Sequence, residues 1–310
     1  MFHWFNEPKV PFIKYSRFFM ALSALGMLAG VWAIFLLGTG RANLGTDFGG
    51  GVLLQYSAKR DLSVDRIRET LRGAGLGDAQ IQQVKEKDVE GFRLMVRIKQ
   101  ELTGQVGKTG DETLALLSKN YPDAGFALEG SDEVGPAVSH RLRNDAIKAF
   151  LISMICIMVY IAFRFDFRFG VISVIATVHD ILLMAGFIVL PGFEFNLLMV
   201  TAILTITGYS LNDTVVIFDR IRENLKHLAE SDYPTLVNRA LNETLNRTIN
   251  TGGTTIAALV PLYLFGGEVL ENFALVLIFG ILMGTYSSVF IATPLAVEWH
   301  RATVGSVKKK

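Results

Sequence analysis

Cysteine is almost absent from this sequence of 310 residues, and charged residues are scarce. The one cysteine, Cys156, lies in an apolar run, which excludes an internal disulfide and a cysteine-rich metal site. Only 19% of the residues are charged, against about 25% in a typical soluble domain. The formal net charge of +1 provides no basic field for nucleic acid. Since 51% of the chain is hydrophobic, we predict an integral membrane protein with a soluble insert.

Enzyme motifs are also missing from the sequence. No Ser/His/Asp, HExxH or Cys/His constellation is present. Gly104–Thr109 resembles a phosphate-binding loop, but the first glycine of that motif would have to stand at Leu102. We therefore predict no enzyme activity, no ATP site, no metal and no cofactor.

Six apolar runs have the length of a membrane-spanning helix, about 17–25 residues. The fifth is the weakest, because it is short and rich in threonine. We predict an α-helical polytopic membrane protein with six transmembrane helices, the first at 18–37 and the other five within 146–298. The six runs are Phe18–Leu37, Ala146–Phe163, Gly170–Leu190, Leu197–Phe218, Ile249–Phe265 and Phe273–Val297.

The positions of Lys and Arg predict the orientation of these helices, because short cytoplasmic loops carry an excess of both residues. The tails 1–17 and 299–310 are basic, as are the links after the second and fourth runs. The short links Pro191–Asn196 and Gly266–Asn272 carry neither Lys nor Arg. We therefore expect both tails to be cytoplasmic and the long segment 38–145 to lie outside.

The outside segment 38–145 is long enough to fold, and its patterns alternate between strand and helix. The order βαββαβ predicts an α+β ferredoxin-like domain between the first and second transmembrane helices, and Ser63 is the expected N-cap of its first helix. The predicted elements are strand Gly49–Ser57, helix Val64–Arg72, strands Ile81–Lys87 and Phe92–Lys99, helix Glu112–Asn120 and strand Phe126–Val134.

The cytoplasmic loop 219–248 is amphipathic. Ile217, Ile221 and Leu225 keep helical spacing with basic residues between them, Pro234 interrupts the pattern, and it resumes from Leu236. We expect this loop to lie along the membrane surface.

Two polar groups stand inside the predicted spans, where a charge costs about 2.5–3.5 kcal/mol on insertion scales. His179 and Asp180 lie near the middle of the third run, and Asp180 shares a helix face with Ser173 and Thr177. They could form a structural polar pair or a proton-sensitive site. Asn212 and Asp213 lie in the fourth run, and Asp213 is roughly 9 Å along the helix from Asp219 at 1.5 Å per residue. A carboxylate there can load and release a proton, or it can be structural.

Arg247 stands at the cytoplasmic start of the fifth run, followed by Thr251, Thr254 and Thr255 on the same side. It is either an ordinary cytoplasmic arginine or the counter-ion of Asp213. The pairs Gly26/Gly30 and Gly280/Gly284 are spaced for close helix packing.

Several strings together resemble the SecF family, the smaller membrane subunits of the bacterial SecD–SecF protein-export complex. The resemblance extends over the whole chain, and the string in the fourth run is its most specific part. The strings are Gly45–Gly51, Val134–Ser139, Val178–Asp180, Gly208–Asn224 and Asn242–Thr248.

The resemblance implies one half of a proton-driven machine of the RND superfamily in the bacterial inner membrane. SecD would be the other half, and the complex would use the proton motive force to promote late steps of protein translocation through SecYEG. Further implied partners are YajC, YidC, the preproteins driven by the ATPase SecA, and the lipid bilayer. Asp213 and Arg247 match family positions implicated in proton flow, and His179 and Asp180 match a family pattern. Half of a proton-coupled small-molecule exporter is the alternative, and a non-transporting scaffold is a third.

Overall fold

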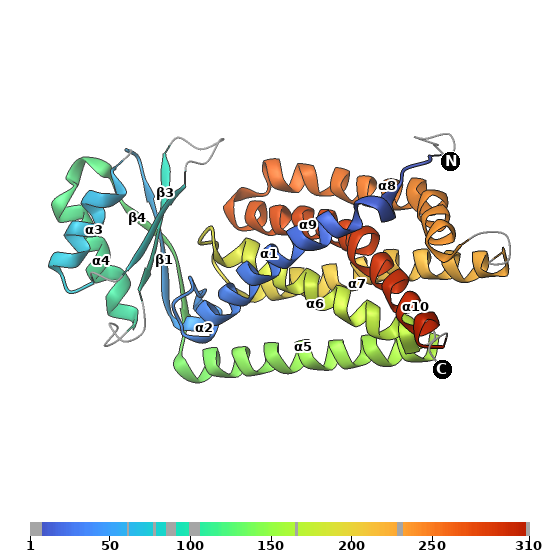
Figure 1. The fold of residues 1–310 in the computed structure, drawn as a ribbon. Helices are drawn as coiled ribbons and strands as arrows, with labels where there is room; N and C mark the ends of the chain where they lie inside the picture. Colours follow the sequence, from blue (N-terminus) through green and yellow to red (C-terminus); the bar gives the residue numbers. More distant parts are fainter. Residues whose placement is uncertain are drawn as a thin grey trace. The chain divides into compact units, whose positions relative to one another are not determined.

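The computed structural model describes residues 8–60, 62–76, 79–84, 91–98, 106–164, 167–227 and 232–307. The chain divides into two compact units. One combines Met1–Asn43 with Ala149–Lys310 and is helical, and the other, Leu44–Lys148, contains a β-sheet (Figure 1).

The unit Leu44–Lys148 contains the predicted alternation of strands and helices. Its elements are α2 (Thr46–Gly49), β1 (Gly51–Ala58), α3 (Val64–Gly73), β2 (Gln80–Val84), β3 (Phe92–Ile98), α4 (Val106–Asn120), the 3-10 turn η2 (Pro122–Ala124) and β4 (Ala127–Val134). The sheet has the order β2-β3-β1-β4, and each neighbouring pair is antiparallel. The short helix α2 was not predicted; it replaces the expected start of the first strand at Gly49.

The core of this unit lies between the sheet and the two longer helices, which cover one face of the sheet (Figure 1). Alternate residues of β1, among them Leu54 and Tyr56, are fully buried against Ile67 of α3 and Leu117 of α4. The Tyr56 hydroxyl donates to the Gly110 carbonyl at 3.1 Å, and burial raises the pKa of Tyr56. Ser63 occupies the predicted N-cap of α3, but its side chain makes no capping hydrogen bond.

The helical unit is built from long helices. They are α1 (Phe12–Gly38), α5 (Pro136–Arg164, which begins in the other unit), α6 (Phe167–Val189), α7 (Leu197–Asn224), the 3-10 turn η3 (Leu225–His227), α8 (Tyr233–Phe265), α9 (Gly267–Ser287), the π-helical turn η4 (Ser288–Ala292) and α10 (Thr293–Val307). Among the described residues, five stretches are long and apolar enough to cross a membrane: Phe12–Gly38, Pro136–Ile161, Phe167–Val189, Leu197–Asn224 and Leu270–Thr303.

The fifth predicted span, Ile249–Phe265, is not among these five stretches. It is the second part of α8, a single helix of 33 residues whose first part is the amphipathic segment predicted from Leu236. Pro234 lies in the first turn of α8, where a proline is tolerated. The amphipathic segment and the following apolar run are therefore one continuous element.

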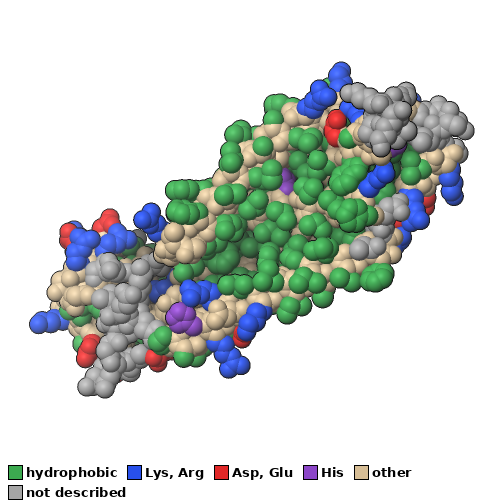
Figure 2. Space-filling view, turned by 60° about the horizontal axis from the view of Figure 1, so that its bottom comes forward, with side chains coloured by type: hydrophobic (Ala, Val, Ile, Leu, Met, Phe, Trp, Pro, Cys, Tyr) green, Lys and Arg blue, Asp and Glu red, His purple; other side chains and the backbone are tan. Residues whose placement is uncertain are grey.

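Small residues let the helices approach closely, as the glycine spacing predicts. A Cβ atom added to Gly30 would overlap the Leu182 carbonyl oxygen of α6, and Gly186 lies against the backbone of Gly30. A Cβ on Gly284 of α9 would come within 2.8 Å of Ser210 on α7. Large apolar side chains of α1 and α5 stay exposed, for example Phe18 and Phe163, and the helical unit presents a broad hydrophobic face (Figure 2). Such a face suits contact with lipid.

Candidate functional site in the helical unit

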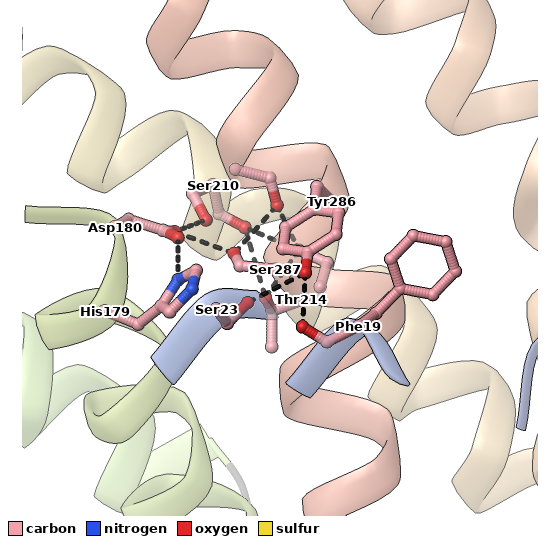
Figure 3. A network of polar contacts seen from close by, with 10 residues as sticks. Phe19, Ser23, His179, Asp180, Ser210, Thr214, Tyr286 and Ser287 are labelled. Atoms are coloured by element: carbon pink, nitrogen blue, oxygen red, sulfur yellow. Dashed lines mark hydrogen bonds and ion pairs between the residues drawn. The ribbon is translucent and has the colours of Figure 1, made fainter. Parts of the chain in front are cut away.

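The two polar residues predicted in the third span form a buried pair. α6 places His179 and Asp180 in the interior, where their side chains are 1% and 2% exposed. His179 Nδ1 and Asp180 Oδ1 are 3.0 Å apart, a geometry in which the ring nitrogen donates to the carboxylate. Asp180 Oδ2 accepts hydrogen bonds from Ser210 of α7 at 2.5 Å and from Ser287 of α9 at 2.9 Å (Figure 3). Both oxygens of Asp180 are thus satisfied, and three helices meet at it.

Hydroxyl groups extend this network toward α1. The Tyr286 hydroxyl donates to the Phe19 carbonyl oxygen at 2.7 Å and lies 2.8 Å from the Ser23 hydroxyl (Figure 3). The Tyr286 ring stacks near the His179 ring, with 6.3 Å between centroids. Within the described part of the chain, His179 Nε2 is buried and has no hydrogen-bond partner. The imidazole is therefore held at one nitrogen only.

The π-helical turn η4 begins directly after Ser287. Its first residue, Ser288, lies 2.8 Å from the Thr214 hydroxyl of α7 and also bonds the Gly284 carbonyl within its own chain segment. Short π-helical turns are frequent at functional sites, because they shift the register of a helix locally. The buried hydroxyl groups therefore fix the helix register next to the Asp180 network.

Asp213 is buried as deeply as this pair, but it has fewer hydrogen bonds. Its residue exposure is 3%, and its described side-chain contact is a donation from Thr285 of α9 to Oδ2 at 3.5 Å. That distance is long for a hydrogen bond. One turn earlier on α7, the buried Tyr209 hydroxyl has no hydrogen-bond partner among the described residues. Asp213 is thus the less satisfied of the two buried carboxylates.

The remaining predicted residues, Arg247 and Asn212, are exposed in this chain. Arg247 is close enough for its positive charge to act on the Asp213 carboxylate, although in the described residues no ion pair joins them. Asn212 points away from the interior, on the exposed side of α7. The structure therefore brings His179 and Asp180 together, sets Arg247 within electrostatic reach of Asp213, and leaves Asn212 outside both groups.

Sequence reasoning missed the partners of the buried carboxylates. It grouped Asp180 with Ser173 and Thr177, but the Ser173 hydroxyl donates to the Phe169 carbonyl of its own helix. The actual donors, Ser210 and Ser287, come from other helices. Hydroxyl residues inside the apolar runs were the available signal. In the described part of the chain, no group of three His, Cys, Asp or Glu side chains could hold a metal ion.

Known protein families and relatives indicate the class to which this protein belongs. The family described as "Protein export membrane protein SecD/SecF, C-terminal" matches residues 117–302. "Protein translocase subunit SecF" of Thermodesulfovibrio yellowstonii is 38% identical over 294 residues, which is 94% of this chain and 95% of that protein. The protein of the same description from Gemmatimonas aurantiaca is 38% identical over 97% of this chain and 91% of its own length.

Solved structures agree with the sequence relatives. The crystal structure of SecDF, described as a translocon-associated membrane protein, from Thermus thermophilus has a TM-score of 0.83 at 35% identity. The match covers 96% of this chain and 40% of that longer chain. The chain therefore belongs to the SecF family. It is a SecF-like subunit that serves protein translocation, which is a transport role. It is also a multi-pass membrane protein.

Proposed function

We propose that this subunit, together with a SecD-like partner, uses the proton motive force to promote late steps of protein translocation across the inner membrane, with no ATP site of its own. The observation that carries the proposal is Asp213. It is a buried carboxylate on a membrane-spanning helix, it has one long hydrogen bond, and a positive charge lies within reach.

Hydrogen bonding distinguishes the two buried carboxylates as proton carriers. Asp180 accepts hydrogen bonds on both oxygens, and adding a proton to it would disturb the bonds from residues of α6, α7 and α9. Asp213 gains or loses a proton without breaking such a network. In the proposal Asp213 therefore carries the proton, while Asp180 and His179 hold α6, α7 and α9 in register around it.

Arg247 supplies the counter-charge in this scheme. When its guanidinium approaches, the ionised Asp213 is stabilised and the proton leaves; when it withdraws, burial favours the protonated acid. Because Arg247 lies on α8 and Asp213 on α7, proton movement is tied to relative movement of these helices. Asn212, beside Asp213 on the exposed side of α7, would line the path by which the proton arrives.

The exposed polar side of the α7–α8 region supports a SecD-like partner. Thr201, Thr205 and Asn212 of α7 and Thr254 of α8 are exposed in this chain. The threonine hydroxyls donate to carbonyls of their own helices, so the Asn212 amide is the group that contact with lipid would disfavour most. Relatives named SecDF combine both subunits in one chain. The partner would cover this polar side and close the proton path. SecYEG, YajC, YidC and SecA-driven preproteins complete the proposed set of partners.

The proposed topology has six membrane spans, with the second part of α8 as the fifth, and both termini in the cytoplasm. It comprises the cytoplasmic tail 1–17, the first span 18–37, the periplasmic domain 38–145, five spans within 146–298 with the cytoplasmic loop 219–248, and the tail 299–310. The strand order β2-β3-β1-β4 and two helices on one face support a ferredoxin-like fold for the periplasmic domain.

Protein export into inverted membrane vesicles, with and without a proton gradient, tests the proposal. Asp213→Asn keeps the side-chain shape but cannot ionise, so the gradient-dependent part of export should fall by tenfold or more at normal protein level. Asp219→Asn is the matched control, since Asp219 lies on the same helix in a partly exposed pair with Arg164. A full response of Asp213→Asn to the gradient would make this carboxylate structural and refute the mechanism. Gradient-driven efflux of small molecules without any effect on export would instead favour the exporter alternative.

A further inference from the structure

A cavity of about 480 Å³ lies between the first part of α1 and α10. Three basic residues line it: Lys14 and Arg17 of α1 and Arg301 of α10. Apolar side chains of the same two helices, Ile13 and Val297, also line it. We name it the α1–α10 pocket. Basic and apolar side chains in the same pocket are the combination that an amphipathic anion would match.

The charges of the α1–α10 pocket do not cancel. Arg301 pairs with Glu298, with 2.8 Å between Nη1 and Oε1, so this pair is close to neutral. Lys14 and Arg17 are exposed, and within the described residues neither makes an ion pair. Lys14 Nζ lies 5.8 Å from the centroid of the neighbouring Tyr15 ring, a contact that leaves its charge uncompensated. The pocket therefore carries two positive charges that no carboxylate balances.

An exposed apolar row of α1 lies on the same helix face as Lys14, one of the residues that line the pocket. Lys14, Phe18, Leu22 and Leu25 follow helical spacing on one face, and the three apolar side chains are 68%, 52% and 66% exposed. A soluble anion would use the basic groups only. A molecule with a phosphate head and an acyl chain would use both the basic groups and this row.

We propose that the α1–α10 pocket binds the headgroup of an anionic phospholipid, whose phosphate lies between Lys14 and Arg17 and whose acyl chain follows Phe18, Leu22 and Leu25. Basic pockets between membrane helices recognise such headgroups, and each Lys or Arg contributes about 1 kcal/mol near an anionic surface. The lipid would fix α1 against α10 at the end of the bundle where the basic tails lie. The site needs α1 to span the membrane but does not depend on proton coupling through Asp213.

Native mass spectrometry of the purified full-length chain tests this site. The protein is titrated with phosphatidylglycerol and, separately, with phosphatidylcholine of the same acyl chains. The unaltered protein should retain phosphatidylglycerol preferentially. Lys14→Gln with Arg17→Gln should weaken its binding by roughly tenfold or more. The charge-keeping exchange Lys14→Arg with Arg17→Lys should preserve most of it.

Arg222→Gln with Lys226→Gln is the matched control. Both residues are exposed and lie outside the pocket, and their replacement removes the same charge as the pocket variant. Equal loss of phosphatidylglycerol in the control and pocket variants would reduce the effect to net charge and overturn the proposal. So would equal retention of both lipids by the unaltered protein. Inorganic phosphate that displaces the lipid at millimolar concentration would assign the pocket to a soluble anion instead. Arg301→Gln, which leaves Glu298 unpaired in the pocket, should weaken binding as well.

Discussion

Gly30 determines how closely α1 can approach α6. The backbones of Gly30 and Gly186 face each other, and a Cβ atom on Gly30 would meet the Leu182 carbonyl, which cannot rotate away. We expect Gly30→Ala to lower the free energy of unfolding by about 1–3 kcal/mol, as overpacking usually does. Thermal unfolding in detergent measures this. Gly38→Ala, at the end of the same helix with open space around it, should be close to neutral; an equal loss in both variants would show that the close contact is unimportant.

The sequence identifies polar residues inside apolar runs more readily than it identifies the residues that contact them. Asp180 and Asp213 stand out because an apolar run rarely contains a carboxylate. The donors to Asp180 could not be predicted, because Ser210 and Ser287 are separated from it by 30 and 107 residues. Which hydroxyl meets which carboxylate depends on helix packing, and helical spacing within one element carries no information on it.

Glu243 joins α8 to the end of α7. Its carboxylate accepts from Arg220 at 2.7 Å, from Asn224 at 2.8 Å and from Arg239 at 3.0 Å. Burial alone would raise the pKa of Glu243, but these hydrogen bonds together outweigh burial and hold the pKa below its usual range. The ionised form is therefore stabilised by folding, and the contribution is present above the unfolded pKa, about 4.3.

We therefore expect Glu243→Gln to lower the free energy of unfolding by about 1 kcal/mol at pH 7, measured as the difference in thermal stability from the unaltered protein. That difference should persist down to about pH 4.3 and disappear as the pH falls through the lowered folded pKa, because protonated Glu243 resembles glutamine. Glu223→Gln is the control, since Glu223 contacts Arg220 and is 62% exposed. A difference that stays constant at low pH would show that the Glu243 charge is not the cause.

Most helices and strands could be placed from sequence, because length and period separate apolar runs from alternating strands. The continuity of α8 was the main exception. Its first part is polar enough for a membrane surface and its second part is apolar, so a change of composition suggested two elements where the backbone forms one. The π-helical turn η4 could not be predicted either, because the residues of Ser288–Ala292 do not differ in type from those of an ordinary α-helix.

The whole molecule combines one unit whose surface is polar with one whose surface is broadly apolar. In the helical unit, one ion pair joins Arg164 at the end of α5 to Asp219 of α7, and another joins Arg220 of α7 to Glu243 in the first part of α8. The links Pro191–Asn196 and Gly266–Asn272 carry no Lys or Arg. Charge asymmetry of this kind orients a membrane protein. The basic ends should be cytoplasmic and the unit Leu44–Lys148 external.

Cysteine labelling decides this orientation in the folded protein. Cys156 is exposed, so it is first replaced by serine to give a background without thiols. Single cysteines are then placed at Asp123 in the unit Leu44–Lys148 and at Lys226 after α7, both of which are exposed positions. An impermeant maleimide should label Asp123→Cys in cells whose outer membrane has been permeabilised, and Lys226→Cys only after the inner membrane is broken. Labelling of Lys226→Cys with Asp123→Cys protected would show that the topology is inverted. Arg247 would then lie on the side from which the gradient drives protons. Its approach to Asp213 could not release protons into the cytoplasm, and the proposed mechanism would fail.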